Sequence, residues 1–585
     1  MIRLQNRTIG FLARSIFEVT HSRTTGRRFI SLVLAFGVIT TMFTLGNTVV
    51  VENAAVASRS MLASEAGVAA MRAGGNAVDA AVTTAFVLAV TYPSAGNLGG
   101  GGFAVIRTPE GDVFTNDHRE RAPNNATEDM FLDEAGEYVA ERALRSHLSS
   151  GVPGSVAGLL ALHERFGVLP REAVIARAIE LARDGFELPA DIARQFVSHH
   201  ERFKHIDSTR RVFYKADGSF YQAGELFKQP DLAATLSRVS EKGRDGFYTG
   251  ETAELIVAEM ARGGGLISKK DLADYEPAWR EPIHGRYRGF DVHSMPPPSS
   301  GGVLIVHLLN MLEPFDLSEL GFHTAPSMHL MIESERRAYA DRAVHLGDPD
   351  FYPVPLDTLL SKRYALRRIE DIGARATTSD DVEAGAVPRE PFETTHFSVI
   401  DADGMAVAFT TTINGGYGSG IVVEGAGFLL NNEMDDFSAK PGTPNMFGLI
   451  GGEANAIEPG KRMLSSMTPT IVSKGNDFIL ITGSPGGSTI ITTTLQVIVN
   501  VIDHGFDMED AVNAPRFHHQ WRPNSVRFEA GIKQKVIDEL DAMGHVNLYR
   551  LPEQAVIGDA NSILKYRGSI TATSDGRNNG GAVGF

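Results

Sequence analysis

Beyond residue 54, the spacing of apolar positions predicts helices and strands that follow one another along the chain. Two runs with apolar residues at helical spacing, 60–73 and 77–91, predict helices. Gly74-Gly75-Asn76 lies between them and provides a helix stop followed by a cap. Strands are predicted by alternating or β-branched runs at 103–107 and 113–116, and near 287–293 within a mainly helical region, 155–373.

A second group of strands follows a segment without periodicity. Residues 374–391 are rich in Thr, Asp, Glu and Pro and predict an exposed loop. Directly after it, the runs 395–401 and 405–413 predict a hairpin about Asp403-Gly404, a strong turn signal. Further elements are predicted at 427–431, 471–472 and 478–482 (strands), 488–502 (a helix), and near 563 and 571 (strands). The pattern is that of a protein mixing helices and sheets, without tandem repeats.

The composition is typical of a soluble globular protein and argues against several classes of function. The chain has 585 residues, 43% hydrophobic and 22% charged, and its length suggests three or four domains. A net charge of −16 argues against nucleic acid as a partner, because phosphate binding needs basic patches. The chain has no cysteine, which excludes disulfides, thiolate metal sites and cysteine nucleophiles.

The N-terminal 51 residues differ from the rest. Six arginines and one acid fall in the first 28 residues, and an uncharged, mostly apolar stretch follows at 29–51. This order is typical of a secretory signal or a membrane anchor. The stretch is just long enough to span a bilayer, and no clear cleavage site follows it. We expect export to the periplasm or cell envelope, with residues 1–51 either removed or retained as an anchor.

The pair Thr394-Thr395 stands at the head of a predicted strand, after the loop-like segment. Taken alone, β-branched packing is the favoured interpretation. Catalysis is the alternative, because a threonine hydroxyl becomes a useful nucleophile when its own α-amino group can take the proton. An internal threonine has no free amine, so this alternative requires the chain to be cut between Glu393 and Thr394.

Several other motifs could carry chemistry, and each also has a plain structural interpretation. Gly483–Gly487, between a strand and a helix, could form an oxyanion hole or simply a turn. Arg119 could hold a substrate carboxylate or pair with Glu120 at the surface. The acidic run 432–437 could hold an ammonium or a metal, or be solvated, and Ser465-Ser466 could donate two hydroxyls. His518-His519 is a weak metal candidate, because adjacent side chains of a strand point in opposite directions.

Together these segments resemble the γ-glutamyltranspeptidase family, of the N-terminal-nucleophile hydrolase class. The similarity extends from about Ala54 to Phe585. It is carried by long motifs in the family's order, namely 74–81, 96–103, 119–123, 394–396, 431–441, 464–467, 483–487 and 517–520.

The resemblance implies a role for each matching residue. Thr394 is the implied nucleophile, Thr412 its hydrogen-bond partner, and Gly486 and Gly487 the oxyanion donors. The implied holders of the substrate α-carboxylate are Arg119, Ser465 and Ser466, and those of the α-ammonium are Asn414, Glu433 and Asp436.

The family's fold and chemistry become expectations for this chain. The implied fold is α+β, a four-layer αββα sandwich in which both pieces of a self-cut chain share one core. Residues 52–393 are the implied large subunit and residues 394–585 the small one. The implied donors are glutathione and other γ-glutamyl compounds, the acceptors water, amino acids or dipeptides, and no cofactor or metal is needed.

The chain differs from the family pattern at two positions of the site, and two alternative functions remain open. Glu433 stands where some members have glutamine, and Phe447, in a lid at 441–452, stands where a tyrosine often occurs. One rival is a related cephalosporin or glutaryl acylase, which would need no ammonium site. The other is an uncleaved envelope-binding protein that kept the fold without the chemistry, against which the retention of Thr394 and Thr412 argues.

Overall fold

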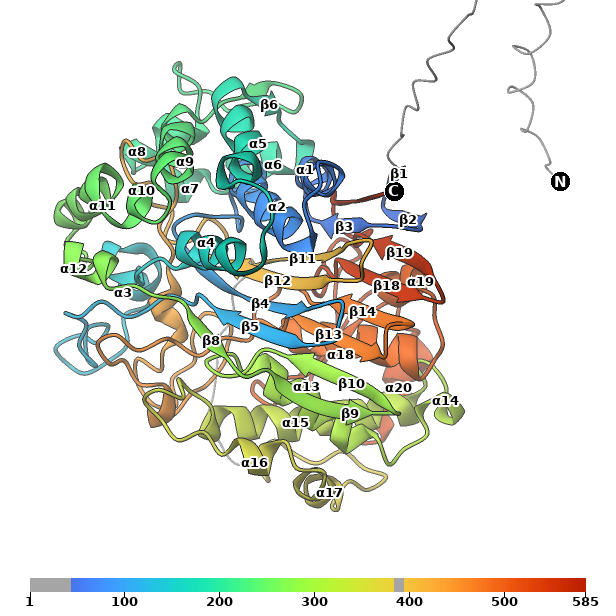
Figure 1. Cartoon of the computed structure of the whole chain (residues 1–585). Coiled ribbons are helices and arrows are strands. Elements are labelled where there is room, and N and C mark those ends of the chain that lie inside the picture. Colours follow the sequence, from blue (N-terminus) through green and yellow to red (C-terminus); the bar gives the residue numbers. More distant parts are fainter. Residues whose placement is uncertain (1–43, 383–393) are drawn as a thin grey trace, which may run out of the picture. The chain divides into compact units, whose positions relative to one another are not determined.

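The computed structural model describes residues 44–382 and 394–585 of the chain. Within them, two antiparallel sheets are stacked between two layers of helices (Figure 1). The fold is therefore α+β, the four-layer sandwich that the resemblance implies. Residues 43–585 form one compact unit, so the expectation of three or four domains from length is wrong. Glu393, on one side of the expected cut, lies outside the described residues.

The first sheet interleaves strands from both sides of the expected cut. Hairpin β11–β12 is bordered by β3 on one edge and β4 on the other, in antiparallel register. The strand order is β1 (Thr44–Gly46), β20 (Gly581–Gly584), β3 (Ala55–Ser58), β11 (Thr395–Ile400), β12 (Ala406–Thr412), β4 (Gly101–Arg107), β5 (Val113–Asp117) and β8 (Ala278–Arg280).

The second sheet is interleaved in the same way. Strands from the C-terminal part of the chain occupy its centre, with earlier strands at both edges. The order is β2 (Thr48–Val51), β19 (Ser569–Thr573), β18 (Ser562–Tyr566), β14 (Phe478–Thr482), β13 (Thr470–Lys474), β10 (Phe290–Ser294) and β9 (Ile283–Tyr287). Two minor sheets join β15 (Phe517–His518), β16 (Val526–Phe528) and β17 (Leu548–Arg550), and β6 (Phe186–Glu187) with β7 (Leu226–Phe227).

Helices cover the outer face of each sheet (Figure 1). The layer on the first sheet includes α1 (Met61–Arg72), α2 (Ala77–Thr91), α4 (Ser155–Phe166), α5 (Arg171–Asp184), α6 (Ala190–Ser198), α9 (Pro230–Lys242) and α11 (Gly250–Gly263). The layer on the second includes α13 (Gly301–Leu312), α15 (Ala325–His345), α17 (Lys362–Ile369), α18 (Thr489–Ile502), α19 (Met508–Asn513) and α20 (Gln534–Ala542). The shorter helices are α3 (Ala140–Arg145), α7 (His200–Phe203), α8 (Asp207–Phe213), α10 (Asp245–Tyr248), α12 (Lys269–Ala273), α14 (Leu317–Leu320) and α16 (Leu356–Leu359).

Strand alternation divides the core into layers. On β11, Phe397 and Val399 join the cluster beneath the helices, whereas Ile400 joins the small aliphatic side chains between the sheets. On β12, Phe409 faces the helices and Ala408 faces the other sheet. Because side chains alternate with period 2, even-numbered residues of both strands face the space between the sheets.

Many sequence predictions are confirmed, and the capping signal explains one of them closely. Helix α2 begins directly after Asn76, whose side chain accepts from the backbone N–H of Asp79, while the Asp79 carboxylate accepts from the Asn76 N–H. This reciprocal capping box satisfies two backbone donors that would otherwise be unpaired at a buried helix start. The hairpin about Asp403-Gly404 also forms, as β11–β12.

Two predicted strands differ from the structure. The single strand near 287–293 is a hairpin, β9–β10, whose turn residues Arg288 and Gly289 both have positive φ, as a tight hairpin turn requires. Residues 427–431 form no strand. The segment makes one isolated bridge, between Val422 and Leu429, because a loop with glycines at positive φ folds it back on itself.

The expected N-terminal segment ends earlier than residue 51. Thr48–Val51 form β2, in which Val49 and Val51 are buried and Val50 is exposed, so these residues serve the sheet and not an anchor. Residues 1–43, which hold the rest of the expected signal or anchor, lie outside the described residues. Across 44–382 and 394–585, no helix is long and apolar enough to cross a membrane.

The first part of the expected loop, 374–382, contains no helix or strand but is attached to the protein. The Ala376 N–H donates to the Met543 carbonyl at 2.8 Å, and the Trp521 indole N–H donates to the Val382 carbonyl at 2.5 Å. Ser379 is buried. These contacts tie the stretch before the expected cut to the C-terminal part of the chain.

Candidate active site

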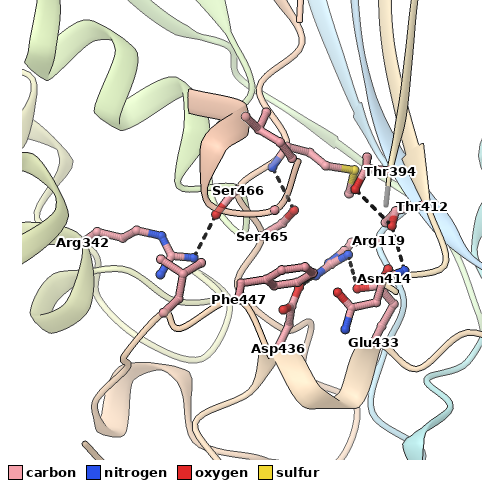
Figure 2. A pocket seen from close by; sticks show the side chains of 14 residues that line it. Arg119, Arg342, Thr394, Thr412, Asn414, Glu433, Asp436, Phe447, Ser465 and Ser466 are labelled. Carbon is pink, nitrogen blue, oxygen red and sulfur yellow. Dashed lines mark hydrogen bonds and ion pairs between the residues drawn. The ribbon is translucent and has the colours of Figure 1, made fainter. Parts of the chain in front are cut away.

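Strand parity places the two central threonines on one face. Thr394 precedes β11 and Thr412 ends β12, and both are even-numbered, so both face the space between the sheets. The Thr394 hydroxyl donates to Thr412 Oγ1 at 3.4 Å (Figure 2). Thr412 Oγ1 also accepts from the Asn414 backbone N–H at 2.7 Å. The side chains of all three residues line one pocket.

Thr395 points to the opposite face, as its odd number requires. It is paired with Thr411 in the ladder, and its hydroxyl is buried without a hydrogen-bond partner in the described chain. The geometry therefore separates the two threonines of the pair: only Thr394 has its hydroxyl in the pocket.

Arg119 is buried opposite the threonines among carboxylates. It follows β5, and its Nη1 lies 2.6 Å from Glu433 Oε2, while its Nη2 donates to Asp436 Oδ2 at 2.5 Å. Glu433 and Asp436 begin and end one turn of 3₁₀ helix, where residues three apart share a face. Glu120 approaches Nη1 from the other side, at 3.6 Å, so the expected Arg119–Glu120 ion pair is buried and not on the surface.

Burial shifts the charges of this cluster. It raises the pKa of Glu120 to about 8 and that of Glu433 well above its usual range, although Arg119 opposes both shifts. It also raises the pKa of Asp436. Burial works against the charge of Arg119 as well, but the three carboxylates outweigh it and raise the pKa of the guanidinium. The pocket thus combines a charged guanidinium with several carboxyl groups, and this combination suits a zwitterion better than a simple ion.

Two serines form the far wall of the pocket. Ser465 Oγ accepts from the Met467 N–H at 3.1 Å, and Ser466 Oγ accepts from Arg342 Nη2 at 3.3 Å. Figure 2 shows both hydroxyls on one loop across the pocket from Thr412. Asn414 closes the opposite side; its Nδ2 donates to the Asn432 carbonyl at 3.0 Å, which fixes the side chain at the pocket wall.

The glycine-rich turn between β14 and α18 completes the pocket near Thr394. Gly487 lines the pocket, and Gly486 and Gly487 have φ values of +131° and +55°, which side chains rarely adopt. A Cβ on Gly483 would lie 2.5 Å from the His396 ring, so the turn packs directly against the strand of Thr394. Its backbone is thus close enough to present amides to a reacting carbonyl.

A loop covers the pocket at the position of the expected lid. Phe447 and Leu449 line the pocket, and both of their backbone N–H groups donate to Asn445 Oδ1, at 3.0 and 3.1 Å. Asn445 Nδ2 in turn donates to Asp436 Oδ1 at 2.9 Å. The free volume between the lining side chains is about 20 Å³, room for about one water molecule.

All ten site residues named from the sequence converge on this region, with nine lining the pocket and Gly486 next to Gly487. A family model for gamma-glutamyltranspeptidase matches residues 63–585. The chain belongs to the γ-glutamyltranspeptidase family.

Individual relatives agree with this assignment. The chain is 48% identical over 512 residues to the glutathione hydrolase proenzyme of Escherichia coli (strain K12), with 87% of each chain covered. Helicobacter pylori gamma-glutamyltranspeptidase, a solved structure, shares 44% identity at a TM-score of 0.53, covering 54% of this chain and 90% of that one. A cephalosporin acylase from Bacillus halodurans shares 27% identity at a TM-score of 0.81, covering 97% and 98%.

Sequence reasoning missed several residues of this γ-glutamyltranspeptidase pocket. Arg342, Met467 and Ile490 line it, as does Leu449 in the lid. Arg342 lies in the last turn of α15, where an arginine is normally solvated, and no local motif distinguishes it. Only its complete burial in the fold reveals its place, so the sequence carried no usable signal.

The two adjacent histidines are core residues. His518 Nδ1 lies 2.8 Å from Thr492 Oγ1 and its Nε2 2.9 Å from Gln520 Oε1, while His519 Nδ1 lies 2.9 Å from the Ser525 carbonyl. Burial lowers the pKa of both rings well below the usual value. Both side chains thus take part in ordinary buried hydrogen bonds.

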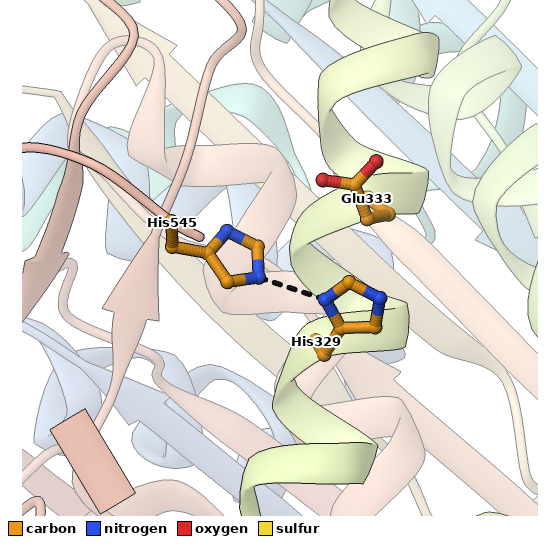
Figure 3. Close-up of side chains that lie close together, drawn as sticks. All are labelled: His329, Glu333 and His545. Atoms are coloured by element: carbon orange, nitrogen blue, oxygen red, sulfur yellow. Dashed lines mark hydrogen bonds between the residues drawn. The ribbon is translucent and has the colours of Figure 1, made fainter. Parts of the chain in front are cut away.

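A different cluster has the geometry of a metal site but not its charge. His329, Glu333 and His545 bring ligand atoms within 4.8 Å of one another (Figure 3). However, the Glu333 carboxylate already accepts from Arg336 Nε at 3.2 Å and Arg337 Nη1 at 2.7 Å. Two guanidinium groups occupy the positions beside the only acid, so a divalent cation there would face uncompensated positive charge. We assign the cluster to the packing of α15.

Proposed function

We propose that the chain is a self-processing γ-glutamyl acyltransferase and hydrolase, which cleaves the γ-glutamyl amide of glutathione and related compounds. The acyl group then passes to water, or to the amine of an amino acid or dipeptide. One observation carries the proposal: a threonine hydroxyl shares a pocket with a buried guanidinium, two serine hydroxyls and a set of carboxylates. These groups suit the carboxylate and the ammonium of one γ-glutamyl unit.

Self-processing comes first. The Thr394 hydroxyl attacks the carbonyl carbon of Glu393, the peptide C–N bond breaks, and the acyl group moves from nitrogen to oxygen. Water then hydrolyses the resulting ester. The products are a Glu393 carboxylate and a Thr394 with both a free hydroxyl and a free α-amino group.

Catalysis uses both new groups. An α-amine with a pKa of about 7.7–8.0 is partly neutral at working pH and can accept the hydroxyl proton of Thr394. The Thr394 oxygen attacks the γ-amide carbonyl, and the leaving amine, cysteinylglycine in the case of glutathione, takes the proton. Water or an acceptor amine then attacks the γ-glutamyl ester and regenerates the hydroxyl.

The remaining residues of the site bind the substrate and stabilise the tetrahedral intermediates. Amides of Gly486 and Gly487 donate to the oxyanion of each tetrahedral intermediate. Arg119, Ser465 and Ser466 hold the α-carboxylate, while Asn414, Glu433 and Asp436 hold the α-ammonium. Glu433 stands where some relatives have glutamine, and the burial that raises its pKa lets it keep a proton and act like the neutral amide.

Two further features belong to the proposal. After the cut, the fragments ending at Glu393 and starting at Thr394 form a heterodimer, because strands of both fragments pair with each other in both sheets. We also propose export to the periplasm or cell envelope, directed by the basic and apolar N-terminal residues. Sequencing the N-terminus of the large fragment tests whether that segment is removed.

The Thr394→Ala variant tests the proposal. We expect an intact chain on a denaturing gel and no hydrolysis of γ-glutamyl-p-nitroanilide, whereas the wild type gives two fragments, the smaller starting at Thr394. Thr395→Ala is the matched control, because Thr395 faces the helices, and it should still be cut and active. Normal cleavage and activity in Thr394→Ala would end the threonine mechanism.

A glutaryl or cephalosporin acylase is the second candidate, favoured by the similarity in fold to the acylase of Bacillus halodurans. An acylase has no need for an ammonium site, whereas here Asn414, Glu433 and Asp436 all line the pocket. Comparing γ-glutamyl- and glutaryl-p-nitroanilide decides between them. A higher kcat/KM for the glutaryl compound would overturn the γ-glutamyl assignment.

A further inference from the structure

Arg342 is a buried arginine in the pocket for which the proposed chemistry has no role so far. It projects from α15 toward the loop of the two serines (Figure 2) and is 5% exposed. Its Nε donates to Ser300 Oγ at 2.9 Å, and its Nη2 donates to Ser466 Oγ at 3.3 Å. Both partners are neutral hydroxyls.

The guanidinium of Arg342 forms no ion pair within the described residues, although the more distant Asp436 carboxylate favours its charged form. Within residues 44–382 and 394–585, no carboxylate oxygen comes within 4.0 Å of its guanidinium. Burial lowers the pKa of Arg342 to about 10, so the side chain is still charged at neutral pH. A buried, unpaired charge is costly, and an arrangement of this kind is stabilised by an anion that binds nearby. Arg119, by contrast, already has three carboxylates beside it.

The hydroxyl groups of Ser465 and Ser466 both act as acceptors in their hydrogen bonds to the protein. A serine hydroxyl has one proton to donate. Ser466 Oγ accepts from Arg342 and Ser465 Oγ accepts from the Met467 N–H, so neither bond uses the serine's own proton. Both protons are left for an acceptor in the pocket.

A second contact of Arg342 fixes the backbone of the same loop. Ser300 Oγ accepts from Arg342 Nε and donates to the Ser465 carbonyl at 2.7 Å, and the Ser300 N–H donates to that carbonyl at 2.8 Å. Arg342 therefore contacts the serine loop directly at Ser466 and, through Ser300, at Ser465.

We propose that Arg342 is a positioning residue of the α-carboxylate subsite, which turns the Ser466 hydroxyl proton toward the substrate carboxylate and adds a second positive charge behind it. The inference rests on the proposed function, because it assumes a γ-glutamyl donor. Arg342 touches no reacting atom. It acts on the substrate through Ser466, and its charge complements that of Arg119 on the other side.

A double-mutant cycle tests the inference. The variants are Arg342→Gln, Ser466→Ala and the combination, assayed with γ-glutamyl-p-nitroanilide and with 4-aminobutanoyl-p-nitroanilide, which lacks the α-carboxylate. For the γ-glutamyl donor, Arg342→Gln should lower kcat/KM about 10- to 100-fold, mostly through KM, as expected for a lost hydrogen bond to a charged group. In the Ser466→Ala background, the same change should cost less than about threefold.

Further variants exclude a merely structural effect. Arg337→Gln removes a neighbouring buried arginine of α15 that pairs with Glu333 and Asp371 outside the pocket. This variant should leave the ratio of the kcat/KM values for the two donors unchanged. Arg342→Lys keeps the charge but cannot reproduce both hydrogen bonds, to Ser300 and to Ser466, so its activity should be intermediate. If Arg342→Gln does not fold, Arg342→Lys replaces it in the cycle.

The outcomes separate the inference from the function beneath it. Additive effects of the Arg342 and Ser466 variants, or an equal loss with both donors, would overturn the inference while the wild-type activity stands. If the wild type does not hydrolyse the γ-glutamyl donor at all, the proposed function fails and the inference fails with it.

Discussion

The hydrogen bond between Thr394 and Thr412 makes a sharp prediction for Thr412→Val, a change that keeps the shape and removes the hydroxyl. Thr412 Oγ1 accepts from the Thr394 hydroxyl at 3.4 Å and from the Asn414 N–H at 2.7 Å. All three residues are buried, at 5%, 3% and 2% exposure, so bulk water does not compete for these bonds. The variant therefore loses two hydrogen bonds at once.

The two bonds affect different quantities. Leaving the buried Asn414 N–H without a partner lowers the free energy of unfolding by about 1–3 kcal/mol. The longer bond orients the proposed nucleophile, Thr394, and a neutral hydrogen bond contributes about 0.5–1.5 kcal/mol, or roughly 2- to 13-fold in kcat. We thus expect Thr412→Val to lower kcat about tenfold and to slow self-cleavage of the chain. Thr412→Ser, which keeps the hydroxyl, should retain most of the kcat and most of the cleavage rate.

Thr411→Val is the matched control. Its hydroxyl donates to the Gly101 carbonyl at 2.9 Å and accepts from Asn97 Nδ2 at 3.1 Å, but it faces the helices. The control should lose a similar amount of stability in urea unfolding and keep kcat with γ-glutamyl-p-nitroanilide. Equal kcat losses in Thr411→Val and Thr412→Val, or no loss in the latter, would refute the reasoning.

Two further predictions concern the turn and the lid. Gly486→Ala should lower kcat about 10²–10³-fold. At the φ of +131° of this residue, the added Cβ would lie 2.2 Å from Thr489 Oγ1 and displace a proposed oxyanion amide. The control Gly475→Ala, at a φ of +58° in an open turn, should keep kcat. Equal kcat values for the two variants would contradict this. Burial raises the pKa of Asp435 to about 7, although hydrogen bonds from the Tyr138 hydroxyl and the Met446 N–H oppose this shift. Because the folded state binds the Asp435 proton more tightly than the unfolded state, this proton stabilises the fold. The stabilisation is complete below about pH 4 and is lost as the pH rises through 7. Wild-type Tm should therefore fall more steeply between pH 4 and 7 than that of Asp435→Asn, and parallel curves would rule out the shift.

Local signals were enough to predict the elements around the proposed nucleophile. The hairpin turn at Asp403-Gly404 and the alternation of β11 and β12 were visible in sequence, and together they determine that Thr394 and Thr412 share a face. The resemblance chose Thr394 over Thr395, and the geometry supplies the physical reason, since Thr395 points toward the helices.

The rest of the pocket depends on contacts between distant parts of the chain, which no local pattern encodes. Arg119 and Asp436 are 317 residues apart, and Arg342 and Ser466 are 124 apart. Buried charges add to the difficulty, because an arginine in a helix normally indicates a solvated face. Residues 427–431 illustrate the opposite error: apolar, strand-like composition gave no strand, because turns at Gly425 and Gly427 determine the path.

The sheet order also explains how the proposed cut at Glu393–Thr394 would create an active site without dividing the protein. Strand β11 pairs with β3 on one edge and with β12 on the other, and β12 pairs with β4 along seven residues, Ala406–Thr412. Separating the fragments would break ladders in the middle of both sheets and expose the core between them. The cut therefore frees only the residues at its ends. Since Thr394 directly precedes β11, its new α-amino group stays beside its own hydroxyl, at the position where the mechanism needs a base.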